Sequence, residues 1–135
     1  MLRTLLGAAP CPWDGILGDT AASMTAFMRL ADKRASKPGK QAARYRAFAV
    51  WTEGLLRSLE ELEESMFAAR LFAERISHVK WAELGEQEKL DYGRHVYFDK
   101  NTYIRLFSLL DKLGTLMNEL MELRTEKIKA KYSYF

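Results

Sequence analysis

The chain contains no proline after Pro38, and this absence limits the folds open to the rest of the sequence. Proline kinks or breaks helices, so the stretch from Gly39 to Phe135 is free to form long, uninterrupted ones. The same stretch is rich in Ala, Leu, Glu, Lys and Arg, which are strong helix formers. No segment alternates polar and apolar residues with the period of two that is typical of strands. The sequence therefore predicts an all-α protein.

Apolar residues recur every three or four positions, which is the spacing of one face of an α-helix. One long helix is expected over about 41–76 and a second from about 86 to beyond 123. A shorter helix is expected from residue 19 or 20 to about 35. The breaks between them are expected in the segment SKPGK, residues 36–40, and near Gly85. Together these segments predict an antiparallel, up-and-down bundle of three to four helices, two of them long.

The length of 135 residues is enough for one domain with a core. We expect a single helical domain over 1–135, with an N-terminal arm at 1–18 and a basic and aromatic tail at 124–135. Cys11 is the single cysteine, which excludes an internal disulfide and fits a cytoplasmic protein. No apolar run is long enough to span a membrane, so no membrane association is expected.

The apolar spacing also predicts which side of each long helix faces the core. In the first long helix the predicted core positions are Phe48, Thr52, Leu55, Leu59, Leu62, Met66, Ala69, Ala73 and Ile76. In the second they are Tyr92, Val96, Tyr103, Leu106, Phe107, Leu110, Leu113, Met117, Leu120 and Met121. Asn101, Arg105, Ser108 and Lys112 fall on the opposite side of the second helix, so a solvated face is expected there.

Asp99 is predicted to point into the core side of the second long helix, with His95 close to it one turn away. A buried carboxylate needs a partner, and the expected candidate is Arg70 in the preceding helix. Two interpretations stay open. In the first, His95 and Asp99 are candidate catalytic residues for acid–base chemistry near Arg70 and Tyr92. In the second, these residues form a polar layer between the helices or a solvated, frayed start of the helix.

A metal site and a cofactor are not expected. The chain has two histidines, and it lacks the Glu-x-x-His pairs of di-iron bundles. Glu74 and His78 are four positions apart rather than three.

Cations are concentrated between residues 29 and 46, an acidic segment follows at 53–64, and the tail is basic again. The cations of the first segment are Arg29, Lys33, Arg34, Lys37, Lys40, Arg44 and Arg46. Lys37, Lys40 and Arg44 are therefore candidates for binding phosphate groups of RNA or a nucleotide. Tyr132, Tyr134 and Phe135 in the tail are candidates for stacking on bases. The alternative interpretation is an ordinary solvated surface.

Residues 88–120, EKLDYGRHVYFDKNTYIRLFSLLDKLGTLMNEL, resemble the central helix of a bacterial branch of the HEPN superfamily. The matching features are an aromatic start at Tyr92, a polar turn with Asn101 and Arg105, and the run LLDKLG at 109–114. The resemblance implies a helical bundle that is often a homodimer, with a role in toxin–antitoxin or other defence systems. It also points to Tyr92, Asn101 and Arg105 as candidate binding residues.

Active members of that superfamily are metal-independent ribonucleases with an Arg followed four to six residues later by a His. Here Arg75 and Arg94 lie too close to His78 and His95, and Arg70 lies too far from His78, so the motif cannot be placed on any residue. The resemblance therefore implies a non-catalytic member, or a shortened one that completes its bundle with another chain.

Three functional hypotheses follow from the sequence. The first is a non-catalytic bundle that self-associates and binds RNA, a nucleotide or a partner protein. The second is an enzyme on RNA or nucleotides that uses His95 and Asp99, with Arg70 on phosphate. The third is a structural protein-interaction module.

Overall fold

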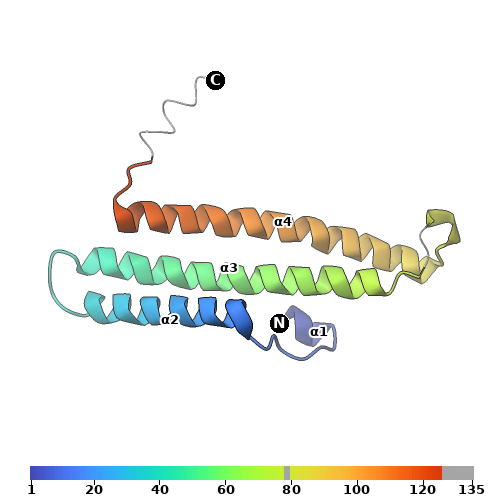
Figure 1. Cartoon of the computed structure of the whole chain (residues 1–135), viewed down its shortest axis with the longest axis horizontal. Helices are drawn as coiled ribbons and strands as arrows, with labels where there is room; N and C mark the ends of the chain where they lie inside the picture. The colour runs from blue at the N-terminus through green and yellow to red at the C-terminus, as the bar shows by residue number, and fades with distance from the viewer. Residues whose placement is uncertain (78–79, 126–135) are drawn as a thin grey trace, which may run out of the picture. The chain divides into compact units, whose positions relative to one another are not determined.

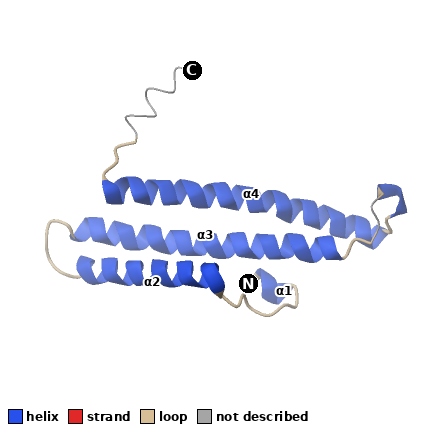
Figure 2. Cartoon of the chain, in the orientation of Figure 1, coloured by secondary structure: helices blue, strands red, loops and turns tan. Residues whose placement is uncertain are grey.

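The computed structural model describes residues 1–77 and 80–125, and every regular element in these ranges is a helix (Figures 1 and 2). In chain order the elements are α1 (Leu2–Leu5), α2 (Gly15–Ala35), α3 (Ala42–Glu74), the short 3-10 helix η1 (Trp81–Glu83) and α4 (Glu86–Met121). Helices α3 and α4 are the two long ones, and they pack against each other. The prediction of an all-α fold with two long helices is confirmed.

Most of the predicted helix boundaries lie within two residues of those observed. One exception is the end of α4, which was expected beyond residue 123 and lies at Met121, before Glu122 with a φ of 54°. The other is the start of α2, which was expected at residue 19 or 20 and lies at Gly15. Asp14 occupies the N-cap position in extended geometry, so the chain enters the helix one turn earlier than the apolar spacing indicates. Residues 15–18 therefore belong to α2 rather than to the arm.

Glu88 fixes the start of α4. Its carboxylate accepts a hydrogen bond from the backbone N–H of Gly85, three residues earlier, at 3.2 Å. This is the returning half of a capping box, in which an acidic side chain in the first turn satisfies the N–H before the helix. The same carboxylate accepts a bond from the Ser77 N–H at 2.8 Å, which ties the start of the α3–α4 connection to α4.

Contacts group the chain into two compact units. Unit 1 consists of residues 1–13 and 58–108, and unit 2 consists of residues 14–57 and 109–135, of which 109–125 are described. The helices α3 and α4 each contribute to both units. The single-domain organisation over 1–135 stays a prediction.

The core of unit 2 lies where α2, the first half of α3 and the end of α4 meet. Its buried residues are Ala31, Phe48, Ala49, Leu55 and Leu116. The Phe27 and Phe48 rings lie 6.5 Å apart, and the Arg34 guanidinium lies 5.6 Å from the Tyr45 ring. These two contacts run in opposite directions along α2 and α3, as the antiparallel prediction requires.

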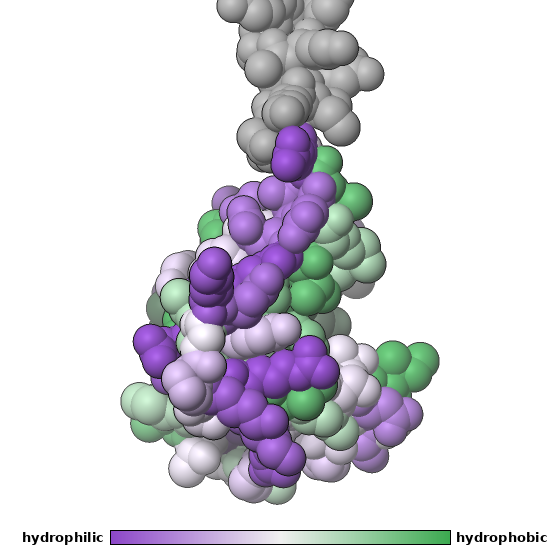
Figure 3. Space-filling view, turned by 90° about the vertical axis from the view of Figure 1, so that its left-hand side faces the viewer, coloured by the Kyte–Doolittle hydropathy of each residue, from purple (hydrophilic) through white to green (hydrophobic). Residues whose placement is uncertain are grey.

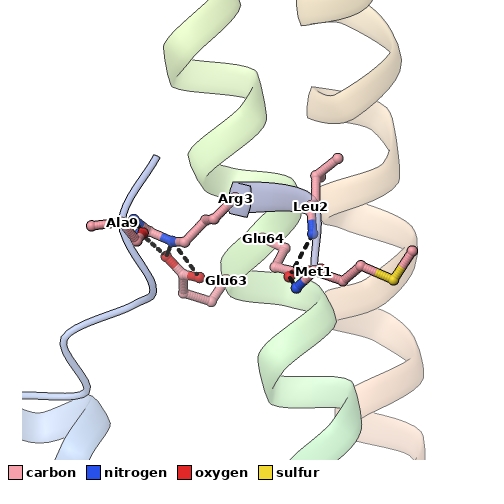
Figure 4. Close-up of polar contacts among 6 residues, drawn as sticks. All are labelled: Met1, Leu2, Arg3, Ala9, Glu63 and Glu64. Carbon is pink, nitrogen blue, oxygen red and sulfur yellow. Dashed lines mark hydrogen bonds and ion pairs between the residues drawn. The ribbon is translucent and has the colours of Figure 1, made fainter. Parts of the chain in front are cut away.

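In unit 1 the N-terminal arm packs on the second half of α3 (Figure 4). The Arg3 guanidinium forms an ion pair with Glu63 and lies 4.1 Å from the centre of the Phe67 ring. The hydrogen bond to Glu63 raises the pKa of Arg3, which stays charged. The Leu2 N–H donates to Glu64 at 2.9 Å. The arm is therefore held by charge-assisted bonds and by a cation–π contact.

Replacing Phe48 with Ala should lower the free energy of unfolding by about 3–5 kcal/mol, because the change removes a buried ring from the core of unit 2. Urea denaturation measures this loss. The matched control is Val50→Ala, two residues away on the exposed side of α3, which should change stability by no more than about 0.5 kcal/mol. Equal losses for the two variants would contradict this core.

Candidate functional site

The candidate residues of α4 lie in a line of polar contacts with α3, all within unit 1. Arg105 donates from Nη1 to Glu61 Oε2 at 2.5 Å. One turn earlier in α4, Asn101 donates from Nδ2 to the Ser65 hydroxyl at 2.8 Å. From the first contact to the second, the residue number falls from 105 to 101 in α4 and rises from 61 to 65 in α3. This part of the two helices is therefore antiparallel.

His95 makes the next contact in the same line. Its Nδ1 lies 2.9 Å from the carbonyl oxygen of Ala69. A carbonyl only accepts hydrogen bonds, so Nδ1 is the donor in this contact. We refer to the contacts of Arg105, Asn101 and His95 with α3 as the interhelical ladder.

An aromatic and charged cluster follows the ladder toward the start of α4. The Phe72 and Phe98 rings are stacked with an interplanar angle of 9°. The Arg94 guanidinium lies 5.5 Å from the Phe72 ring and donates to the carboxylate of Asp91 at 2.9 Å. Asp91 is the buried carboxylate of this helix, and no feature of the sequence distinguished it from the exposed acids.

The predicted orientation of α4 about its axis is wrong. Most of its predicted core positions are exposed, while Asn101 and Arg105, expected on a solvated face, are half-buried against α3. Ser65 and Glu61 on α3 supply partners for these two polar side chains, which explains why the polar side of α4 can face its neighbour. The apolar stripe is the name used below for the exposed residues Tyr103, Phe107, Leu110 and Met121, whose spacings of four, three and eleven positions correspond to one, one and three helical turns.

The buried side of α3 agrees with the prediction at Phe48, Thr52, Leu55 and Ala69 and departs from it at Met66. Met66 was expected in the core and is exposed, while its neighbours Ser65 and Ala68 are buried. Small side chains at these positions let α4 approach closely, and the Ser65 hydroxyl is satisfied by Asn101.

Asp99 was predicted to point into the core, and this prediction is wrong because its side chain is exposed. Arg70, its expected partner, is exposed as well. Within the described residues no hydrogen bond or ion pair joins His95 to Asp99, or either of them to Arg70. The acid–base arrangement is therefore not assembled in this conformation, and a catalytic role for His95 and Asp99 stays a prediction. Tyr92 packs edge-on against Trp81 with the ring centres 5.4 Å apart, and both rings remain partly exposed.

The candidate cations of unit 2 differ in their surroundings. Lys37 and Lys40 are exposed in the connection between α2 and α3. Arg44 is engaged: it donates to the Glu119 carbonyl at 2.9 Å and lies 3.0 Å from the Glu122 carboxylate. Arg44 thus satisfies a carbonyl near the C-terminal end of α4.

Figure 3 views the side of the molecule with the loop between α2 and α3, where hydrophilic residues cover much of the face. The predicted stacking residues of the tail, Tyr132, Tyr134 and Phe135, and the second histidine, His78, lie outside the described residues.

Residues 1–77 and 80–125 contain no group of three or more His, Cys, Asp or Glu side chains arranged to hold a metal ion. In the same ranges no helix combines the length and apolar character needed to cross a membrane.

Comparison with protein families matches residues 51–135, well over half of the chain, to the family model HEPN_Cthe2314, which describes a HEPN-like domain. The match extends beyond residues 88–120, on which the resemblance was first recognised. It includes all of the interhelical ladder. No curated protein and no solved structure matches the chain.

Replacing Ser65 or Asn101 with Ala should each destabilise the protein by about 1–2 kcal/mol, because each change leaves a polar partner unsatisfied between the helices. The double variant should cost less than the sum, with a coupling of about 1 kcal/mol in urea denaturation. The control cycle uses Glu53 and Arg57, an exposed pair one turn apart on α3, whose coupling should stay below about 0.5 kcal/mol. A coupling of zero for Ser65 and Asn101 would contradict the ladder.

Proposed function

Because the chain belongs to the HEPN_Cthe2314 family of HEPN-like domains, we propose that it is a non-catalytic binding domain that self-associates through α4. The apolar stripe is the observation that carries this proposal. It lies on the side of α4 that the contacts with α3 leave open. A side of a helix this apolar is normally covered by protein.

The exposed area of the stripe is large for a single chain. Tyr103 is 57% exposed, Phe107 68%, and Ile104 beside them 65%. Aromatic side chains bury about 150–250 Å² each when fully covered, so these residues with Leu110 and Met121 expose on the order of 500 Å². Patches larger than a few hundred Å² mark interaction sites on soluble proteins. The area is more than half of the ~800 Å² that each partner contributes to a standard interface.

The sequence supports the non-catalytic part of the proposal, since no Arg and His have the spacing of the HEPN ribonuclease motif. In addition, His95 Nδ1 is hydrogen-bonded to the Ala69 carbonyl, and the Asp99 side chain is exposed to solvent. An enzyme that uses His95 and Asp99 is the alternative. A toxin–antitoxin or defence context follows from the family alone and stays a prediction.

A second surface favours RNA or nucleotide as a ligand. Lys37 and Lys40 are exposed on the connection of unit 2, and the cations Arg29, Lys33, Arg34 and Arg46 of the flanking helices are exposed as well. Exposed cations in this number attract phosphate groups without base selectivity. Arg44 is excluded from this set because Glu119 and Glu122 engage it.

The protein should sediment as a dimer at micromolar concentration, and Phe107→Asp should make it a monomer, because a charge in the middle of the apolar stripe cannot be buried without a partner. Analytical ultracentrifugation measures the mass, and circular dichroism should show unchanged helix content. The control is Ile16→Asp, which places the same charge on an exposed apolar residue of α2. A monomeric wild-type protein would refute self-association.

Single-stranded RNA should bind at low salt with an affinity that falls steeply as salt increases. Lys37→Glu combined with Lys40→Glu should weaken binding about tenfold or more at 50 mM salt, since two phosphate contacts are lost. Fluorescence anisotropy with a labelled oligonucleotide measures both effects. The control is Arg57→Glu combined with Lys80→Glu, which makes the same change in net charge at two exposed cations outside the basic segment. Equal weakening by the control would argue against the basic segment as the binding surface.

A further inference from the structure

This inference rests on the proposed binding of RNA or a nucleotide to unit 2 and concerns one site within that unit. We propose that a cavity at the end of α4 binds a terminal phosphate group, and that Glu122 occupies the place of this phosphate in the free protein. The cavity has a volume of about 240 Å³ and is lined by Arg44, Asn118, Glu119, Glu122 and Arg124. All five residues belong to unit 2.

The backbone at the end of α4 places Glu122 beside the start of α3 (Figure 1). The chain reverses there through a Schellman motif, in which the Leu123 N–H donates to the Asn118 carbonyl at 3.1 Å. The residue before Leu123 in this motif has a positive φ and is commonly glycine, but here it is Glu122 with a φ of 54°. A side chain is unfavourable in this conformation, and the one present forms an ion pair with Arg44 at 3.0 Å. The glutamate therefore makes a contact that glycine at this position could not make.

Arg44 is oriented by contacts that do not involve the Glu122 side chain. Its Nη2 donates to the Glu119 carbonyl at 2.9 Å, and its guanidinium lies 5.4 Å from the centre of the Phe48 ring. The Glu122 carboxylate contacts the other terminal nitrogen, Nη1, and its side chain is 68% exposed. An exposed ion pair contributes little stability, so this carboxylate can turn out to solvent easily. Arg44 then keeps its orientation and offers Nη1 to a ligand.

Two further donors on the cavity have no partner among the described residues. Asn118 Oδ1 accepts bonds from the N–H and the hydroxyl of Thr125, both at 2.9 Å. A backbone N–H only donates, so the amide is oriented with Oδ1 toward Thr125, and its Nδ2 forms no hydrogen bond within the described ranges. Arg124 is exposed and forms no ion pair in the same ranges. The cavity therefore offers three donor groups once Glu122 leaves.

The charges of the cavity favour a phosphate monoester. In the free protein two guanidinium groups and two carboxylates line it and nearly cancel, so a ligand that replaces the Glu122 carboxylate has to be a stronger anion. A terminal phosphate carries a charge of about −1.5 to −2 at pH 7 and has three acceptor oxygens. A diester in the RNA backbone carries a single charge, as a carboxylate does. The volume lies below the roughly 300–1,000 Å³ of pockets that enclose a drug-sized ligand, and it therefore fits a phosphate group better than a whole nucleotide.

The test compares Glu122→Gln with wild type. The probes are an internally labelled single-stranded RNA with a phosphate at its 5′ end, at its 3′ end or at neither, and AMP as an unlabelled competitor. Fluorescence anisotropy at low salt should show that wild type prefers a phosphorylated RNA about tenfold, the effect of one added charge-assisted hydrogen bond. Glu122→Gln should raise this affinity about tenfold further, since it releases Arg44. It should leave the affinity for RNA without a terminal phosphate within about twofold.

The matched control is Glu53→Gln, which makes the same change in net charge and releases Arg57 from an exposed pair outside the cavity. It should change the affinity for all three RNAs by the same factor, no more than about twofold. Arg124→Gln should remove the preference for a terminal phosphate, because it removes one of the two guanidinium groups. Circular dichroism should show unchanged helix content in all three variants. Competition by AMP at the affinity of the phosphorylated RNA identifies a mononucleotide as the source of the phosphate, and its absence identifies an RNA end.

The outcomes separate this site from the proposed RNA surface. RNA binding without a preference for a terminal phosphate, in wild type and in Glu122→Gln, overturns the phosphate site and leaves the RNA surface standing. An equal gain with Glu53→Gln also overturns the site. If wild type binds no RNA, the RNA surface fails, and isothermal titration calorimetry with AMP decides the site. AMP binding that Glu122→Gln strengthens and Arg124→Gln removes supports the site, and the absence of AMP binding overturns it.

Discussion

The interhelical ladder between α3 and α4 is the constraint on which the orientation of α4 depends. Asn101 and Arg105 find partners on α3, and His95 finds a backbone carbonyl one turn further along α3. A polar contact at each of these turns of α3 favours one register of α4 and one rotation about its own axis, because a shift by one residue would break these bonds and leave the buried Ser65 hydroxyl without Asn101. The ladder therefore decides which side of α4 is left for other molecules.

This arrangement assigns different roles to two sets of residues on one helix. The polar residues, which in sequence look like a working site, hold the helix in place, and the apolar residues, which look like a core, are presented outward. The same division holds for the basic segment. Arg44 has a structural task at the end of α4, whereas Lys37 and Lys40 are left exposed. Residue type alone does not separate a binding residue from a supporting one; its partners do.

The helices and their approximate limits were predictable from the sequence, because proline placement and apolar spacing act locally. The family was predictable from the resemblance of residues 88–120. The orientation of α4 was not. Periodicity showed correctly which side of α4 is apolar, and Asp99 does lie beside that side. The error was to equate the apolar side with the inside of a single chain. The orientation of α4 depends on the bonds that Asn101 and Arg105 form with Ser65 and Glu61 of α3. These bonds join residues far apart in sequence, so periodicity within one helix cannot reveal them. Glu88 is a different case, since a capping box can be recognised from local spacing.

The boundary between the two compact units has a practical consequence for dissecting the protein. It crosses the α1–α2 connection once, between Trp13 and Asp14, but it also falls inside α3, after Arg57, and inside α4, after Ser108. Domains that are separable by limited proteolysis are joined by exposed, irregular linkers. A protease or a truncation that divides this chain at the unit boundary has to cut two helices in mid-course, leaving new helix ends without caps. Fragments are therefore poor tools here, and the contributions of the two units are better separated by point substitutions in the intact chain.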